Sequence, residues 1–246
     1  DLLGIKEVPN HCYYGIHTMR ALENFKISSL NIGQQPYFLC ALAQVKKASA
    51  QANVEVGKIS EQISHAIQGA CDLIIQNPEH WHKEFPLDVY QGGAGTSINM
   101  NMNEVIANIA LEMLGYRKGQ YDILNPNDHV NKSQSTNDVY PTALRLATYS
   151  MLDPLFEQMQ HLVASLENKA LEFKTVLKMG RTQLQDAVPM TLGQEFHAFA
   201  TLLKEDVRLI KTTRELLLEI NLGATAIGTG INTASGHAKR VTRYLQ

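Results

Sequence analysis

Cysteine is scarce in this chain, and its distribution argues against a disulfide framework and against a zinc site. The 246 residues include three cysteines, Cys12, Cys40 and Cys71. A disulfide framework or a zinc site needs more thiols at closer spacing, so we expect neither. His80 and His82 stand two apart, which is poor spacing for joint ligation, so we expect no metal site. A reducing, cytoplasmic location is the simplest inference.

The chain has neither an excess of positive charge nor a long apolar run, and both absences limit the partners that it can bind. The formal net charge is −2, and phosphate contacts need clustered lysine and arginine, so a nucleic-acid partner is not expected. Apolar runs stay well below the length of a membrane span, and the N-terminus lacks the basic-then-apolar pattern of a signal peptide, so no membrane partner is expected. Hydrophobic residues make up 44%, which is enough for a substantial folded core.

Helical periodicity dominates from residue 37 onward, and strand signals are few. Apolar residues recur at spacings of three and four within residues 38–49, 59–74, 98–114, 155–173 and 192–217, and a shorter helical run occupies residues 143–151. Pro78 should end the second helix, and Pro154 should stand in the first turn of the helix around 155–173. Thr191 and Gln194 form a capping-box pattern. The prediction is a mainly α fold of long, bundled helices.

Three polar segments interrupt these helices, each at or just before an expected helix start. They cover residues 91–97, 125–144 and 179–189 and centre on Thr96, Thr136 and Thr182. A helix N-terminus presents unpaired N–H groups and a positive dipole, which favour an anion. Each segment alone is most simply a capping loop. Three together, rich in hydroxyls and amides, indicate a site for a small dianion and for an oxyanion that forms during reaction.

The glycine-rich segment at residues 91–97 raises the separate possibility of phosphate binding. It has no Gly-Lys-Ser/Thr ending, follows no strong strand and carries no dinucleotide fingerprint, so nucleotide binding is disfavoured. Its glycines allow close backbone approach to a small ligand, with Thr96 and Ser97 placed to cap the next helix.

Five segments resemble the aspartase/fumarase superfamily, and its aspartase branch most. They are YGIHTMRA at residues 14–21, GAGTSINMN at 93–101, NDHVNKSQSTND at 127–138, GRTQLQDAVP at 180–189 and GATAIGTG at 223–230. The similarity covers essentially the whole chain.

The resemblance implies a lyase that reversibly converts L-aspartate to fumarate and ammonia without a cofactor. The implied intermediate is an aci-carboxylate dianion held by hydroxyl and amide donors. Thr96, Ser135 and Thr136 match the cage around the reacting carboxylate. Asn137 matches a contact to the amino and carboxylate end of the substrate, and Thr182 matches another substrate contact. The neighbouring Ser97 and Gln183 are further candidate substrate contacts.

The chain departs from the family pattern at two points. Most members have histidine where this chain has Gln183, which favours aspartase over fumarase and replaces a possible proton carrier with a neutral amide. The family's Gly-Ser-Ser-x-Met-Pro-x-Lys-x-Asn loop, which carries the serine believed to be the base, does not occur in the sequence. We therefore expect the chain to be truncated, with no catalytic residue of its own and the serine base beyond Gln246. His129 is expected to be structural.

The resemblance also implies an architecture and an assembly. Residues 1–136 should form an N-terminal helical domain, and residues 137–246 the first part of a central helical bundle. The family forms homotetramers in which three subunits build each active site, so the three polar segments need not meet within one chain. Activation by a divalent cation such as Mg²⁺ is compatible with the sequence, although no metal ligands are assigned.

Two alternatives to the aspartase reading remain open. The first is a class II fumarase, which interconverts fumarate and L-malate and differs mainly in the leaving group. The second is a non-catalytic, truncated paralogue that acts as an assembly partner for a full-length chain. The intact mass of the active protein would separate the second alternative from an incomplete sequence.

Overall fold

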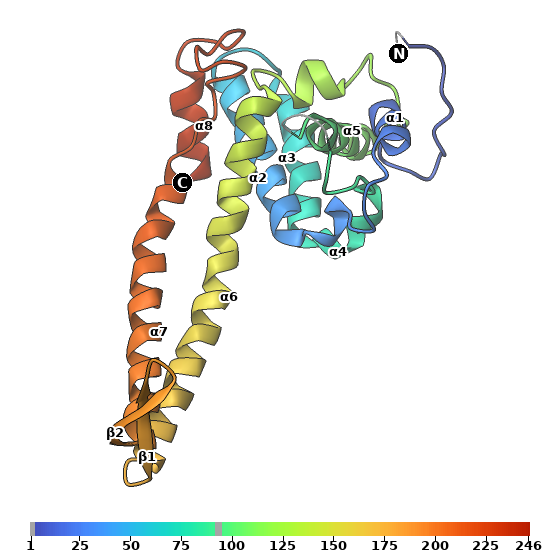
Figure 1. Ribbon diagram of the computed structural model, residues 1–246. Coiled ribbons are helices and arrows are strands. Elements are labelled where there is room, and N and C mark those ends of the chain that lie inside the picture. Colours follow the sequence, from blue (N-terminus) through green and yellow to red (C-terminus); the bar gives the residue numbers. More distant parts are fainter. Residues whose placement is uncertain (1–2, 92–94) are drawn as a thin grey trace. The chain divides into compact units, whose positions relative to one another are not determined.

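The computed structural model describes residues 3–91 and 95–246, and the glycine-rich residues 92–94 lie outside that description. Figure 1 labels the helices and strands along the chain. In order they are α1 Ile16–Asn24, η1 Ile32–Gln34, α2 Pro36–Glu55, α3 Glu61–Gln76, α4 Pro78–Trp81, η2 His82–Glu84, α5 Thr96–Met113, η3 Pro126–Val130, α6 Thr136–Glu172, β1 Leu177–Thr182, β2 Gln185–Thr191, α7 Leu192–Arg214, η4 Glu215–Leu218 and α8 His237–Leu245. The mainly α prediction is confirmed.

The chain divides into two compact units. One unit runs to Ala147 and includes Ile220–Gln246, and the other is Thr148–Glu219. Helix α6 begins in the first unit and continues into the second. The domain boundary expected after residue 136 concerns the complete bundle and stays a prediction.

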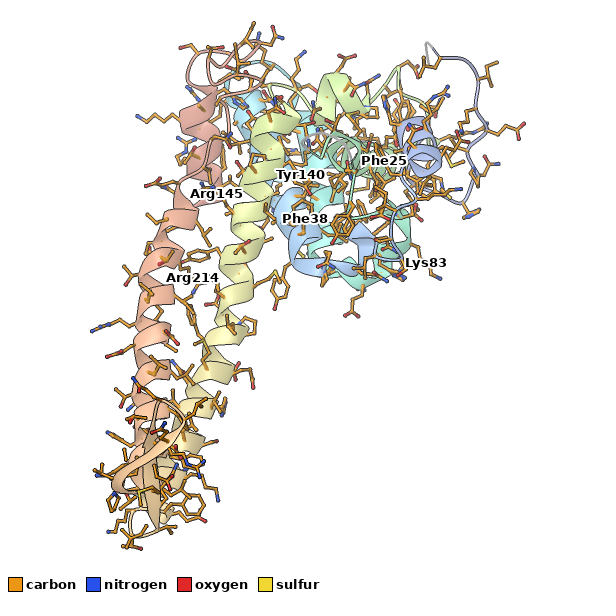
Figure 2. The ribbon with its side chains drawn as sticks, viewed as in Figure 1. Phe25, Phe38, Lys83, Tyr140, Arg145 and Arg214 are labelled. Atoms are coloured by element: carbon orange, nitrogen blue, oxygen red, sulfur yellow. The ribbon has the colours of Figure 1, made fainter. Side chains whose placement is uncertain are left out.

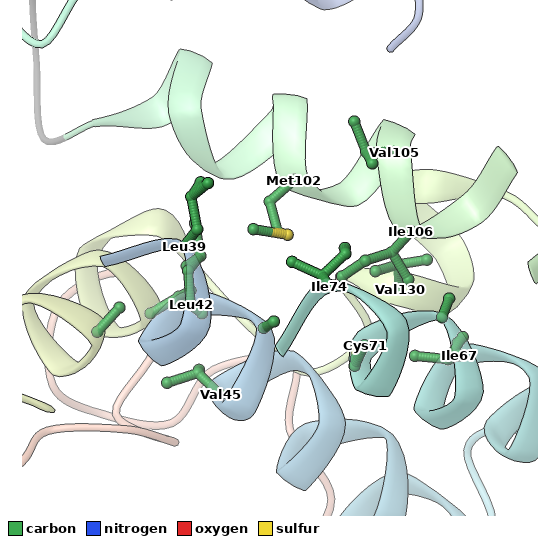
Figure 3. Close-up of a cluster of buried hydrophobic side chains, with 14 of the residues drawn as sticks. Leu39, Leu42, Val45, Ile67, Cys71, Ile74, Met102, Val105, Ile106 and Val130 are labelled. Carbon is green, nitrogen blue, oxygen red and sulfur yellow. The ribbon is translucent and has the colours of Figure 1, made fainter. Parts of the chain in front are cut away.

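The core of the first unit lies among α2, α3 and α5, which pack side by side (Figures 1 and 3). Their apolar stripes supply side chains with almost no solvent exposure: Leu39, Leu42, Val45, Ile67, Cys71, Ile74, Met102, Val105 and Ile106. Burying one such large side chain contributes roughly 1.5–3 kcal/mol. This core fixes α5, so the first turn of α5 is held on a rigid support.

A buried carboxylate fastens the N-terminal segment to α5. Glu104 accepts hydrogen bonds from the backbone N–H groups of Gly15 at 2.8 Å, His17 at 2.8 Å and Thr18 at 3.2 Å. It also accepts the hydroxyl of Thr18 at 2.7 Å. These N–H groups belong to the start of α1, where a helix has no internal acceptors, so Glu104 caps α1 from a distance in sequence.

The second unit is built from the distal part of α6, a β-hairpin and α7. Arg214 of α7 is labelled in Figure 2. It binds Asp153 of α6 through two hydrogen bonds of 2.6 and 2.8 Å, and its guanidinium lies 3.7 Å from the ring centroid of Tyr149. At the other end of the pair, the rings of Phe173 and Phe196 are 5.6 Å apart. The two helices are therefore tied together at both ends.

Two local expectations for the second unit are wrong. The polar segment at residues 179–189 is not a turn before a helix but most of an antiparallel hairpin formed by β1 and β2. Pro154 does not begin a helix, because α6 is continuous over 37 residues and also absorbs the run at 143–151. Pro154 and Ser150 are both exposed, so the carbonyl that loses its helical partner at the proline can be solvated.

Other local predictions are confirmed. Helix α3 ends at Gln76, directly before Asn77 and Pro78. Thr191 and Gln194 form the reciprocal capping box, with hydrogen bonds of 3.2 and 2.9 Å. Among the described residues, no helix combines the length and apolar character needed to cross a membrane.

Candidate functional site

The start of α6 carries three of the predicted site residues on a reciprocal cap. The Ser135 hydroxyl oxygen accepts the Asn137 backbone N–H at 3.2 Å, and the Asp138 carboxylate accepts the Ser135 N–H at 3.1 Å. Ser135 and Thr136 are half-buried and Asn137 is exposed. The sequence places small hydroxyl and amide residues where the first helix N–H groups lack helical partners, and the Ser135 hydroxyl satisfies that of Asn137. The positive end of the helix dipole makes this end of α6 attractive to an anion.

Asp138 secures this helix start to a distant loop. Its carboxylate also accepts the backbone N–H groups of Gly223 at 3.1 Å and Thr225 at 2.7 Å. Burial raises the pKa of Asp138 above its ordinary value, although these N–H donors and nearby Lys46 favour the ionised form. The loop at residues 223–230, one of the family-like segments, is thereby joined to the predicted site.

Asn137 is engaged by the same loop. Its side-chain amide donates to the backbone carbonyl of Ala226 at 3.0 Å, and the backbone carbonyl of Asn137 accepts the side-chain amide of Asn221 at 3.1 Å. Ala226 therefore takes one N–H of this amide, and the second N–H is the one that can contact a substrate.

The start of α5 lies against the start of α6. Gly95, with φ +82°, precedes α5, and a Cβ built on it would lie 2.3 Å from the ring of Tyr140 on α6. Only glycine can take this conformation and this close approach without strain. Farther along α5, the Asn99 amide donates to the Thr136 hydroxyl oxygen at 3.1 Å. The structure therefore brings the first turn of α5, with exposed Thr96 and half-buried Ser97, beside Ser135 and Thr136.

Thr182 and Gln183 belong to the second unit. Thr182 ends β1 and pairs with Gln185, so the hairpin turn consists of Gln183 and Leu184, with φ values of 50° and 63°. Neither residue is glycine or asparagine, and each such left-handed conformation costs about 1–2 kcal/mol. All of these side chains are exposed. Their predicted convergence with Thr136 stays a prediction.

His129 serves the loop before α6. Its Nδ1 accepts the backbone N–H of Asn125 at 2.8 Å, within the π-helical turn η3. Burial lowers the pKa of His129 below its ordinary value, which favours the neutral ring that this hydrogen bond requires. These contacts describe a histidine that holds its own loop.

Lys46, which no sequence motif singles out, contacts the loop before α6. Lys46 is fully buried on α2, and its ammonium nitrogen donates to Asn131 Oδ1 and Gln134 Oε1, both at 2.9 Å. Burial lowers the pKa of Lys46 to about 7, and Asp138 partly opposes that shift. A lysine on an amphipathic helix usually belongs to the solvated face, so only the alanine-rich surroundings of Lys46 in the sequence hinted at burial.

The described residues contain no group of three or more histidine, cysteine, aspartate or glutamate side chains arranged to hold a metal ion. What the corner of α5 and α6 offers is hydroxyl and amide donors, two helix N-termini and the buried side chain of Lys46. That chemistry suits a small anionic ligand.

Comparison with known proteins agrees with this chemistry. Residues 4–246 match a protein family described as Lyase. The chain is 57% identical to aspartate ammonia-lyase of Escherichia coli (strain K12) over 245 residues, which is 100% of this chain and 51% of that protein. It is 52% identical over 245 residues to aspartate ammonia-lyase of Corynebacterium glutamicum, covering 100% of this chain and 46% of that protein.

Solved structures give the same picture. A fumarate lyase:delta crystallin from Brucella melitensis, bound to cobalt, aligns with TM-score 0.95 and 50% identity over 100% of this chain and 53% of its own. A recombinant class II fumarase from Schistosoma mansoni aligns with TM-score 0.86 and 36% identity over 100% of this chain and 51% of its own. The chain spans about half the length of the curated relatives it matches. The chain belongs to this lyase family, which is the aspartase/fumarase superfamily that five of its segments resemble.

Proposed function

We propose that the protein carrying this chain is an aspartate ammonia-lyase, which reversibly converts L-aspartate to fumarate and ammonia. The observation that carries the proposal is the corner where α5 and α6 begin. There Thr96, Ser135 and Thr136 gather hydroxyl donors beside two helix N-termini. The identity of 57% to a protein of this name supports the choice of substrate.

The reaction in this proposal develops charge on a carboxyl group. A base removes one Cβ proton of L-aspartate, and the electron pair of the C–H bond moves into the adjacent carboxylate, which becomes a doubly negative aci-carboxylate. The electron pair then returns to form the C=C bond of fumarate, while the C–N bond breaks and ammonia leaves with its electrons. Donors that meet the dianion more strongly than the substrate lower the barrier.

Each predicted site residue has a role in this proposal. Thr96, Ser135 and Thr136 hold the aci-carboxylate, with Ser97 beside them. Asn137 contacts the amino and carboxylate end of the substrate. The hairpin turn contributes the hydroxyl of Thr182 and the amide of Gln183 as neutral donors. The base in this proposal is a serine that is not among these residues.

The proposed enzyme is a cytoplasmic homotetramer with active sites shared between subunits. Support comes from the second unit, where α6 and α7 expose large apolar side chains, among them Leu155, Leu162, Leu171, Phe199, Leu202 and Leu209. Exposed apolar surface of this kind commonly packs against another copy of the chain. In such an assembly, a hairpin from one subunit can complete a corner of another.

Turnover by the full-length protein tests this function. Fumarate absorbs in the ultraviolet, so its formation from L-aspartate and from L-malate can be followed separately. We expect turnover of L-aspartate, and turnover of L-malate alone would identify a fumarase instead. Thr136→Ala should reduce the rate about 100- to 1,000-fold. Thr201→Ala, which removes an exposed hydroxyl bonded to the His197 carbonyl on α7, is the matched control.

A further inference from the structure

The hydroxyl of Thr136 is held by a buried amide on a different helix. Asn99 of α5, 1% exposed, donates from its single Nδ2 atom to Thr136 Oγ1 at 3.1 Å and to Asn131 Oδ1 at 3.2 Å. Both hydrogens of the amide are therefore used, one on each acceptor.

The orientation of the Asn99 amide is fixed from behind. Asn131 Oδ1 accepts three donors: Lys46 Nζ at 2.9 Å, Asn99 Nδ2 at 3.2 Å and Asn103 Nδ2 at 3.2 Å. A charged lysine has no lone pair to offer, so Asn131 must turn its oxygen towards protonated Lys46, and the neutral amine keeps two N–H groups for Asn131 and Gln134. With the Asn131 oxygen in that place, a flipped Asn99 would set oxygen against oxygen.

This orientation decides what Thr136 can do. A threonine hydroxyl has one hydrogen and two lone pairs, and the Asn99 N–H occupies one lone pair. Among the described residues, no acceptor receives the Thr136 hydrogen. The hydroxyl hydrogen is thus available to a ligand at the corner of α5 and α6, and Thr136 acts there as a donor.

We propose that Asn99, oriented by Asn131 and Lys46, is a positioning residue that fixes Thr136 as a hydrogen-bond donor to the substrate carboxylate. The inference rests on the proposed function. It adds a series of hydrogen bonds that begins at Lys46 on α2, passes through the side chain of Asn131 to Asn99 on α5, and ends at the hydroxyl of Thr136.

A purely structural role makes a different prediction from a positioning role. Buried amides that only satisfy one another should affect folding when replaced, with no specific effect on turnover. A positioning residue acts through its target, so its replacement should matter little once the Thr136 hydroxyl has already been removed.

The experiment is a double-mutant cycle in the full-length protein, with kcat and KM for L-aspartate and the urea unfolding midpoint measured for every variant. The variants are Asn99→Leu, Thr136→Val and the two combined. Losing an oxyanion donor lowers the rate about 100- to 1,000-fold. We expect each single variant to lower kcat at least about 30-fold, with a smaller change in KM. The double variant should stay within about threefold of Thr136→Val.

Two further variants keep the test decisive. Asn101→Leu removes an equally buried amide from the same helix, where it donates to the Glu84 carbonyl at 2.9 Å, and should lower the midpoint while leaving kcat near wild type. Asn99→Asp preserves the side-chain volume in case Asn99→Leu does not fold. Its carboxylate should accept the Thr136 hydroxyl and lower kcat as well.

Each outcome has a defined meaning. Losses in kcat that multiply in the double variant, or an Asn101→Leu loss equal to that of Asn99→Leu, would overturn the inference and leave the proposed function intact. A wild-type protein that does not turn over L-aspartate would refute the proposed function and the inference together.

Discussion

Lys46 is fully buried on α2, so its proton affinity is coupled to the free energy of unfolding. Burial lowers the pKa of Lys46 from 10.5 to about 7 in the folded protein. At a pH below both values the lysine is charged in both states, and the folded state bears the full cost of burying an ammonium group. Between them the unfolded chain binds more protons, so stability should rise as pH increases.

The size of the effect follows from these two pKa values. One group contributes a slope of at most about 1.4 kcal/mol per pH unit. Allowing for half-protonation near the folded pKa, Lys46 should add about 2 kcal/mol of stability between about pH 7 and pH 9, and less than about 0.5 kcal/mol between about pH 5.5 and pH 7.

Lys46→Met isolates this contribution because methionine has a similar length and no charge. Urea unfolding of the wild type and the variant should be measured at each pH, and their difference in unfolding free energy compared. Titrating groups that do not interact with Lys46 are present in both proteins, so their own titration largely cancels in the difference. The carboxyl of Asp138 and the thiol of Cys71 interact with the Lys46 charge, so the change in their pKa values on Lys46→Met is part of the difference.

We expect the unfolding free energy of the wild type to rise relative to that of Lys46→Met as pH rises from about 7 to about 9. A difference that stays constant over this interval would show that Lys46 keeps an ordinary pKa, and the buried network around Asn131 would then need another description.

Three further predictions concern single side chains. Thr136→Ala should remove about 3 kcal/mol of transition-state stabilisation and much less of the free energy of unfolding. Equal losses in the two free energies would indicate that Thr136 only caps the helix. Glu104→Ala should cost about 3 kcal/mol or more of unfolding free energy because it strands buried N–H groups, and exposed Glu112→Ala should cost little by the same urea assay. Gly95→Ala should destabilise by more than about 1 kcal/mol, since its methyl group meets the Tyr140 ring at a positive φ; an unchanged melting temperature would contradict that packing.

Much of the helical architecture could be predicted because apolar periodicity and end signals act locally. The end of α3 before Pro78 and the capping box of α7 are examples. The β-hairpin could not, because most of its side chains are exposed and leave no alternating apolar pattern, and its turn uses Gln183 and Leu184 in place of glycine. Helix α6 continues through Pro154 because Ser150 and Pro154 are exposed to solvent, and the sequence alone does not show that exposure.

The residue types of the candidate site could be predicted from the sequence, but their arrangement in space could not. Hydroxyl and amide residues before helix starts pointed to an anion site, and the structure brings the segments around Thr96 and Thr136 together. Nothing local in the sequence connects Asn99 to Thr136, which is 37 residues away. Nothing local connects Asn99 to Lys46 either, because that link runs through the side chain of Asn131. Long-range hydrogen bonds arise only when the helices pack.

The central claim, that this corner belongs to an enzyme acting on aspartate, is tested most directly in the reverse direction. Full-length protein should be incubated with fumarate and ammonium in deuterium oxide, and the products identified by proton NMR. We predict L-aspartate carrying one deuterium at Cβ, since ammonia adds to Cα and the solvent-derived deuteron to Cβ. L-malate as the main product, or unchanged fumarate, would contradict the account.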